Sequence, residues 1–330
     1  MDAKGKGWLR SGITWALTAG VAAYVVLKID WSNLRAAAGQ ADWRYVAAAV
    51  LVTLVGNLFV GPDRWRLILA RLGCRISLGQ AVFIKIAGSP VKFVVPMKMG
   101  EFFRAFYLSR HLGHNLERAL SSVLMEKVAN MLAAGVFLVV GLALAGVRQW
   151  GWEALGVTAA LLVAFILPGG QRAVGAALGR LSPRLGRRFA DILSALAELT
   201  LADKVVILLY SLVFVLTELA IAFLSFRALG MRVPLLTFFV FTPLSIMASI
   251  PTFSGIGTRE VAARWFFSAA GPFLIEYGTP DARVLAGFLV TVIYYLFPPI
   301  VGLPWSRTFM HRCIWKNAEA RPVADAGRAT

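Results

Sequence analysis

The sequence predicts an all-α integral membrane protein with six to eight transmembrane helices and two re-entrant hairpins broken by proline and glycine. Three observations lead to this fold class. Of the 330 residues, 58% are hydrophobic and only 15% are charged, and the mean hydropathy is +0.71. Such a composition is too apolar for a soluble protein of this length. Long uncharged runs recur along the chain, and Pro/Gly breaks interrupt two further apolar runs.

Six of the apolar runs are long enough to cross the hydrocarbon core of a bilayer as helices. They cover residues 12–28, 45–61, 119–147, 154–168, 205–226 and 284–304. The first follows a basic N-terminus, as a secretory signal does. Because no small-residue cleavage site comes after it, we interpret it as a retained span.

Two further runs, 78–97 and 234–252, are expected to be re-entrant, within elements of about 78–113 and 234–271. The first holds Lys85 and two prolines, which is costly for a lipid-exposed span. The second is uncharged but breaks at Pro251. Unpaired backbone amides cannot face lipid, so both breaks should lie where protein or a wet cavity surrounds them.

The distribution of Lys and Arg predicts the orientation of the chain. With two hairpins, the segments on the inner side are 1–11, 62–127, 169–204 and 305–330. They carry 25 of the 34 Lys and Arg residues, as the positive-inside rule requires. Both termini are then cytoplasmic. Eight full spans are the alternative, which would export Arg104, Arg110 and Arg118.

We expect one polytopic membrane domain over residues 1–315 and a disordered tail over 316–330. A basic amphipathic segment at about 171–204 should lie at the cytoplasmic surface. The net charge of +17 arises mainly between apolar runs, which favours a surface facing anionic lipids over binding of nucleic acid.

Two elements share one pattern: a proline, then glycine, then a glutamate that opens a helix of about three turns, then a glycine that ends it. The first runs from Pro96 through Gly100 and Glu101 to Gly113, with its helix over 102–112; the second runs from Pro251 through Gly255, Gly257 and Glu260 to Gly271, with its helix over 261–270. An inverted repeat would produce such a pair, with both helix N-termini directed at an anionic ligand. Chance similarity between Pro/Gly-rich turns is the alternative.

Glu218 is the sharpest single-residue signal, because it lies near the middle of run 205–226, which contains no basic residue. A carboxylate at that depth costs roughly 2.5–3.5 kcal/mol, so it should face the bundle interior and be protonated or have a partner. We interpret it as a proton-coupling group or as a contact for a cationic headgroup. A purely structural hydrogen bond to a neighbouring helix is the alternative.

Glu126 and Lys127 lie about two turns into run 119–147. Glu126 and Asn130 are four residues apart and share a helix face, whereas Lys127 points about 100° away. This spacing favours a polar cluster on the cytoplasmic side. Snorkelling of Lys127 to the interface is the alternative.

Several cations surround the two breaks. Lys85, Lys92 and Lys98 would attract a phosphate as point charges, and Arg104 and Arg259 could each hold it with two parallel hydrogen bonds. Ordinary positive-inside residues are the competing interpretation for the lysines.

The carboxylates Glu101 and Glu260 are expected either to pair with the neighbouring arginines or to contact the ligand. No cofactor or metal site is expected, since His114 falls beyond the predicted helix end that follows His111.

Three stretches resemble the lysylphosphatidylglycerol synthase transmembrane family, also called flippase-like. They are Val94 to Glu101 with Arg104 and Leu108, Ala119 to Lys127, and Pro251 to Glu260. Arg64-Trp65 is similar to an Arg-Trp pair of that family, and the resemblance covers about residues 45–305. Where the family usually has Glu-Arg and then Asp, this chain has Glu126-Lys127 and Asn130.

The resemblance implies that the protein moves a phospholipid or isoprenoid-linked headgroup across the bacterial cytoplasmic (inner) membrane, with lipid-biosynthetic enzymes as candidate partners. Bifunctional members carry a soluble C-terminal domain for aminoacyl transfer. This chain ends soon after its last predicted span, so we expect that activity to be absent. One alternative is a membrane-embedded headgroup transferase with Glu101 and Glu126 as its acid/base pair, and another is an accessory subunit of a lipid-biosynthetic complex.

Overall fold

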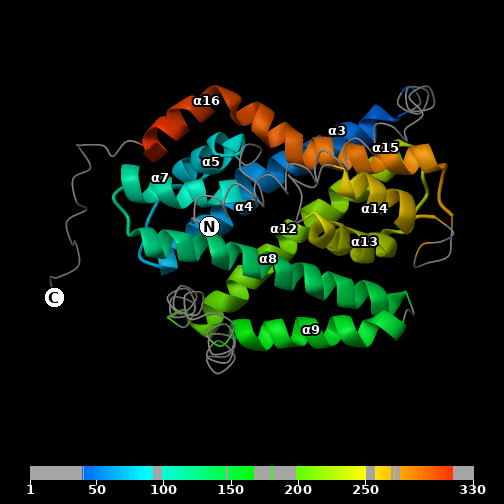
Figure 1. The fold of residues 1–330 in the computed structure, drawn as a ribbon, viewed down its shortest axis with the longest axis horizontal. Coiled ribbons are helices and arrows are strands. Elements are labelled where there is room, and N and C mark those ends of the chain that lie inside the picture. Colours follow the sequence, from blue (N-terminus) through cyan, green and yellow to red (C-terminus); the bar gives the residue numbers. More distant parts are fainter. Residues whose placement is uncertain are drawn as a thin grey trace, which may run out of the picture.

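Helices form every regular element of the residues that the structure describes (Figure 1). In this computed structural model these residues are 39, 41–91, 99–145, 148–166, 180, 198–249, 257–268, 271 and 276–314. The predicted all-α membrane fold is confirmed over this part of the chain. The predicted span 12–28, the tail 316–330 and most of the amphipathic segment 171–204 lie outside the described residues.

Four helices in the described part are long and apolar enough to cross a membrane. Two of them, α8 (Leu116–Leu144) and α12 (Leu201–Ala228), are uninterrupted α-helices. The other two are long helices that each contain a short π-helical stretch. One consists of α3 (Trp43–Val55), η1 (Gly56–Val60) and α4 (Gly61–Arg71). The other consists of α15 (Pro280–Thr291), η3 (Val292–Leu296) and α16 (Phe297–Ile314). The protein is therefore a multi-pass membrane protein.

Shorter helices flank the two predicted breaks. The first pair is α5 (Leu78–Ala87) and α7 (Phe103–His111), and a 3-10 turn, η2 (Met99–Phe102), directly precedes α7. The second pair is α13 (Leu235–Ala248) and α14 (Thr258–Phe266). With 10 and 14 residues, α5 and α13 are shorter than the roughly 20 residues a crossing needs. The re-entrant path itself stays a prediction. A further helix, α9 (Arg148–Ile166), packs beside α8.

The order long helix, broken hairpin, long helix occurs twice along the described chain. Equivalent elements pack in equivalent ways: α8 lies against α13 and α16 lies against α5, while α7 packs on α8 and α14 packs on α15. Figure 1 places α5 and α7 toward one end of the long helices and α13 and α14 toward the other. This arrangement supports the inverted repeat that the two Pro/Gly patterns predict.

Glycines permit the closest helix contacts in both repeats. A Cβ added at Gly302 of α16 would lie 2.1 Å from the Ile86 carbonyl oxygen of α5. At Gly141 of α8, it would lie 2.8 Å from the Phe239 Cβ of α13. The backbones therefore approach too closely for any larger residue, which is a common way for membrane helices to pack.

The second hairpin is also held by aromatic packing. Its phenylalanine cluster consists of Phe226 on α12, Phe238 and Phe241 on α13, and Phe266 and Phe267 at the end of α14. Ring centroids are 4.5 Å apart for Phe226 and Phe267 and 4.9 Å apart for Phe241 and Phe267. All five rings are buried, so this hairpin is anchored by apolar contacts.

Several predicted boundaries are wrong. The span predicted over 45–61 continues to Arg71, so Arg64 and Trp65 lie inside the helix rather than after it. The helix predicted over 261–270 begins at Thr258 and ends at Phe266. It starts directly after Gly257, whose φ of 82° suits glycine. By contrast, α7 agrees closely with the predicted 102–112, and Gly113 follows it with a φ of 74°.

Candidate functional site

Arg64 is completely buried where α4 faces α8 and α12. Its Nη2 lies 2.8 Å from Glu126 Oε1, and its Nη1 donates hydrogen bonds to Ser211 Oγ at 3.1 Å and to Asn130 Oδ1. The guanidinium also lies 4.7 Å from the centroid of the Phe214 ring. Three helices are thus tied together through one planar cation, which suits the fork of guanidinium donors.

Glu126 on α8 receives two more cations from the first hairpin. Lys85 Nζ of α5 lies 2.8 Å from Glu126 Oε1, and Arg104 Nη1 of α7 lies 3.0 Å from Glu126 Oε2. The Glu126 side chain is only 5% exposed. Both halves of the broken element therefore meet at one buried carboxylate.

Glu101, at the turn before α7, extends this network. Its Oε2 lies 3.0 Å from Arg104 Nη2 and 2.5 Å from Lys127 Nζ. Trp65 covers the arginine, since the Arg104 guanidinium lies 4.9 Å from the indole ring. Lys127 therefore does not merely snorkel to the interface, although its side chain is 37% exposed.

These six side chains, Arg64, Lys85, Glu101, Arg104, Glu126 and Lys127, are called the basic cluster below. Four are cationic and two are anionic, so the described cluster carries a formal excess of two positive charges. The two arginines and the two glutamates are buried, whereas the two lysines are partly exposed. Ion pairing offsets the cost of burying such charges, particularly at membrane depth. Among the described residues, Arg64 Nε is also buried without a hydrogen-bond partner. The arrangement has the chemistry of an anion site.

A second polar group lies among α12, α14 and η3. The Tyr294 hydroxyl donates a hydrogen bond to Glu218 Oε1, and Arg259 Nη2 donates to the Tyr295 hydroxyl at 2.6 Å. The Arg259 guanidinium lies 4.3 Å from the centroid of the Tyr295 ring. Glu218 thus faces the bundle interior and has a partner, as its depth predicts. These four residues with Glu260 are called the tyrosine cluster.

Of the two alternatives for Glu260, pairing with Arg259 is not found: the described residues show no ion pair between them, although both are buried. Successive helical residues point about 100° apart, so Arg259 reaches Tyr295 while Glu260 lies beside Thr291. The corresponding prediction for Glu101 and Arg104 is confirmed, because a spacing of three residues places both on one face.

The two clusters are close enough to interact electrostatically. Tyr295 interacts with the charge of Arg259 and, more weakly, with those of Glu218 and Glu101. Glu101 belongs to the basic cluster, whereas Glu218 belongs to the tyrosine cluster. Tyr295 is therefore affected by charges from both clusters.

The structure brings most of the predicted site residues together. Glu101, Arg104, Glu126 and Lys127 share the basic cluster, and Glu218, Arg259 and Glu260 share the tyrosine cluster. Gly100 is buried at the turn before α7, and Gly257 caps α14. Lys92, Lys98 and Gly255 lie outside the described residues.

Sequence reasoning missed several functional candidates. Ser211, Tyr294 and Tyr295 did not stand out because they are uncharged residues within long apolar runs. A hydroxyl inside such a run is itself a signal, since it needs a partner in hydrocarbon. The sequence indicated Arg64 only through its Arg-Trp motif, because the predicted span 45–61 ends before this residue.

The fold and its two clusters define a multi-pass α-helical membrane protein with a buried, ion-paired site at a broken hairpin. A family model described as the lysylphosphatidylglycerol synthase TM region matches residues 8–302, and the chain belongs to this family. A comparison with curated proteins gives no match. Family membership supports a role related to membrane lipids.

Proposed function

We propose that the protein is a flippase that moves the anionic headgroup of a phospholipid or isoprenoid-linked lipid across the bacterial cytoplasmic membrane. One observation carries the proposal: the basic cluster formally holds two more positive than negative charges, and both of its arginines are buried. A phosphodiester or pyrophosphate headgroup supplies the missing negative charge. The family match supports a lipid as the molecule that bears it.

The headgroup would bind by competing with Glu126 for its cations. Arg104 and Lys85 come from the two halves of the first hairpin, so a small shift of either half would transfer them from carboxylate to phosphate. Arginine can hold a phosphate by two parallel hydrogen bonds, and lysine acts as a point charge. The acyl or isoprenoid chains would remain in the bilayer.

The two hairpins would act as re-entrant elements that approach from opposite faces of the membrane. Their placement toward opposite ends of the long helices supports this arrangement (Figure 1). Broken helices of inverted repeats commonly meet at the substrate site of transporters. Glu218 would then supply a proton-coupling group or counter-charge, since it is buried and accepts a hydrogen bond from Tyr294.

The ion pairs favour transport over a headgroup transferase. That alternative needs Glu101 or Glu126 as an acid or a base, yet Glu126 is held by three cations and Glu101 by two. Such contacts stabilise the ionised form and occupy its lone pairs. We therefore propose that the two carboxylates position cations rather than transfer protons to a substrate.

The test is transport by the purified full chain in vesicles. Phosphatidylglycerol labelled on an acyl chain keeps its natural headgroup, and dithionite then reports how much label reaches the outer leaflet. Arg104→Gln should slow transport about tenfold or more, since a charge-assisted hydrogen bond is worth about 1.5–3 kcal/mol. Arg110→Gln is the matched control, because Arg110 is exposed on the same helix.

The choice of lipid sharpens the result. Labelled phosphatidylcholine should move more slowly than labelled phosphatidylglycerol, since it carries no net negative charge. An isoprenoid-linked phosphate is the third probe. If folded wild-type protein moves none of these lipids faster than empty vesicles do, the proposed function is wrong.

A further inference from the structure

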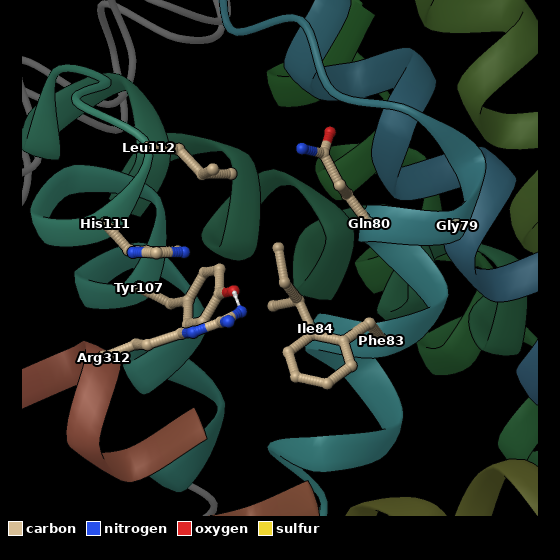
Figure 2. A pocket seen from close by; sticks show the side chains of 8 residues that line it. All are labelled: Gly79, Gln80, Phe83, Ile84, Tyr107, His111, Leu112 and Arg312. Atoms are coloured by element: carbon tan, nitrogen blue, oxygen red, sulfur yellow. Dashed lines mark hydrogen bonds between the residues drawn. The ribbon is translucent and has the colours of Figure 1, made fainter. Parts of the chain in front are cut away.

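A separate cavity of about 240 Å³ lies among α5, α7 and α16 (Figure 2). Its polar lining residues are Gln80 on α5, Tyr107 and His111 on α7, and Arg312 on α16, and none of the lining residues is acidic. None of them belongs to the basic cluster. The cavity is smaller than the roughly 300–1,000 Å³ of typical ligand pockets, so it suits a headgroup rather than a whole lipid.

Arg312 is the arginine among the residues that line this cavity. Its Nη1 donates to the Tyr107 hydroxyl at 2.9 Å, and its guanidinium lies 5.8 Å from the centroid of the Phe83 ring. In the described part of the chain it has no carboxylate partner. A guanidinium has five N–H donors, so most of them remain available. Figure 2 shows the guanidinium projecting between Tyr107 and Phe83 into the cavity.

Gln80 adds a second donor with a fixed orientation. Its Oε1 accepts a hydrogen bond from the Ser77 backbone N–H at 2.8 Å, as part of the capping box that starts α5. The oxygen is thereby occupied, and the amide NH2 is the group left for a ligand. Gly79 also lines the cavity in the first turn of α5, where backbone N–H groups lack intrahelical acceptors.

The remaining walls are neutral or apolar. Burial, and to a smaller extent the charge of Arg312, lower the pKa of His111, which therefore keeps a neutral imidazole near pH 7. Phe83, Ile84 and Leu112 provide apolar surface beside the polar donors. The Tyr107 ring is fixed by stacking on Phe309, with centroids 5.2 Å apart and planes 3° apart.

We propose that this cavity is a second anion site that binds a phosphoester group through Arg312 and the Gln80 amide. The group comes from a lipid headgroup or from free phosphate, and the two sources can be separated experimentally. Tyr107 lies three residues after Arg104, on the same side of α7. An occupied cavity would therefore also restrain the helix that carries Arg104 into the basic cluster.

The test is ligand-induced thermal stabilisation of the purified full chain in a nonionic detergent. The probes are dihexanoyl phosphatidylglycerol, dihexanoyl phosphatidylcholine and inorganic phosphate at equal concentrations. Stabilisation from independent sites adds, so removing the cavity site should remove about half or more of the shift caused by the phosphatidylglycerol. If inorganic phosphate alone raises the unfolding temperature, free phosphate is sufficient to occupy the site. If only phosphatidylglycerol raises it, the ligand is the lipid headgroup.

Three substitutions define the site. Arg312→Gln removes the main donor, and Arg307→Gln is the matched control because Arg307 is exposed on the same helix. Gln80→Glu is a second, independent variant. Glutamate at this position still completes the capping box, so α5 should form normally while a carboxylate repels the anion.

The proposal requires a reduced shift with Arg312→Gln and Gln80→Glu and an unchanged shift with Arg307→Gln. An equal shift in all three variants overturns it. A shift reduced equally by Arg307→Gln also overturns it, because net charge would then explain the effect. Binding is measured here without transport, so a failure of the flippase assay would leave this result in place.

Discussion

The two broken hairpins follow one plan but are held by different chemistry. Ion pairs tie the first hairpin to the bundle, since Lys85 and Arg104 both contact Glu126. The phenylalanine cluster packs the second hairpin, with Phe267 at its centre. Ion pairs can be exchanged for a ligand, whereas buried aromatic rings cannot. Under the proposed function, the comparison favours ligand exchange at the first hairpin and a more rigid role for the second.

The difference extends to the carboxylates within the long helices. Glu126 has three cationic partners, whereas Glu218 has the hydroxyl of Tyr294. A phenol hydroxyl can donate a hydrogen bond to a carboxyl group whether that group is protonated or ionised. An ion pair with a cation, in contrast, requires the ionised carboxylate. Substitutions that remove charge should therefore have very different effects in the two repeats.

The largest expected effect is that of Glu126→Gln. It leaves the partnered cations buried without their carboxylate, which should reduce the free energy of unfolding by about 3–5 kcal/mol. Glu218→Gln should cost about 0.5–1.5 kcal/mol, since the amide oxygen can still accept from Tyr294. Thermal unfolding of both variants in detergent measures the difference. Adding Lys85→Met to Glu126→Gln should recover part of the loss, and equal costs for the two single variants would contradict the comparison.

A smaller effect is expected for Tyr294→Phe. It leaves the buried Glu218 Oε1 without this hydrogen-bond donor, at a cost of about 1–3 kcal/mol. The same change in a Glu218→Gln background should cost less, because a neutral amide loses a weaker bond. A double-mutant cycle on unfolding free energies gives the coupling between the two residues. A coupling of zero would show that Glu218 does not depend on this hydroxyl.

The smallest effect tests the two close helix contacts. Gly302→Ala places a methyl group against the Ile86 carbonyl oxygen, so α16 must move away from α5, at about 1–3 kcal/mol. Gly141→Ala should cost less, because the nearest atoms of α13 lie 2.8 Å from the added Cβ, compared with 2.1 Å at Gly302. Gly156→Ala on α9 is the control. Nothing lies within 4 Å of its added Cβ, so this change should be neutral or slightly stabilising in the same unfolding assay.

Much of the fold can be predicted from the sequence because membrane spans and Pro/Gly breaks leave local signals. The four long helices and the starts of α7 and α14 all lie near their predicted positions. The continuation of the second span past Arg64 to Arg71 could not be predicted in this way. A hydropathy pattern stops at a charge, but the helix continues because Glu126, far along the chain, compensates that charge.

The site was predictable only in part, for a similar reason. Glu101 and Arg104 could be paired because their spacing is local, whereas Lys127 finds Glu101 only through the packing of α7 on α8. For Arg259 and Glu260, adjacency in the sequence suggests a contact that the helix does not allow, because adjacent helical residues point in different directions. Tyr294 could not be assigned to the site from the sequence, because one hydroxyl adds little polarity to the apolar run 284–304.

The π-helical stretch η3 sets the rotational phase of the last helix. Phe297 N–H donates to the Val292 carbonyl, which accommodates one extra residue in this turn. Deleting that residue would rotate everything beyond it by about 100°. Arg312 would then turn away from its cavity while Arg259 and α14 kept their places. The extra residue thus sets the orientation of Arg312 relative to Arg259, so a deletion in this stretch should disturb the last helix more than a substitution does.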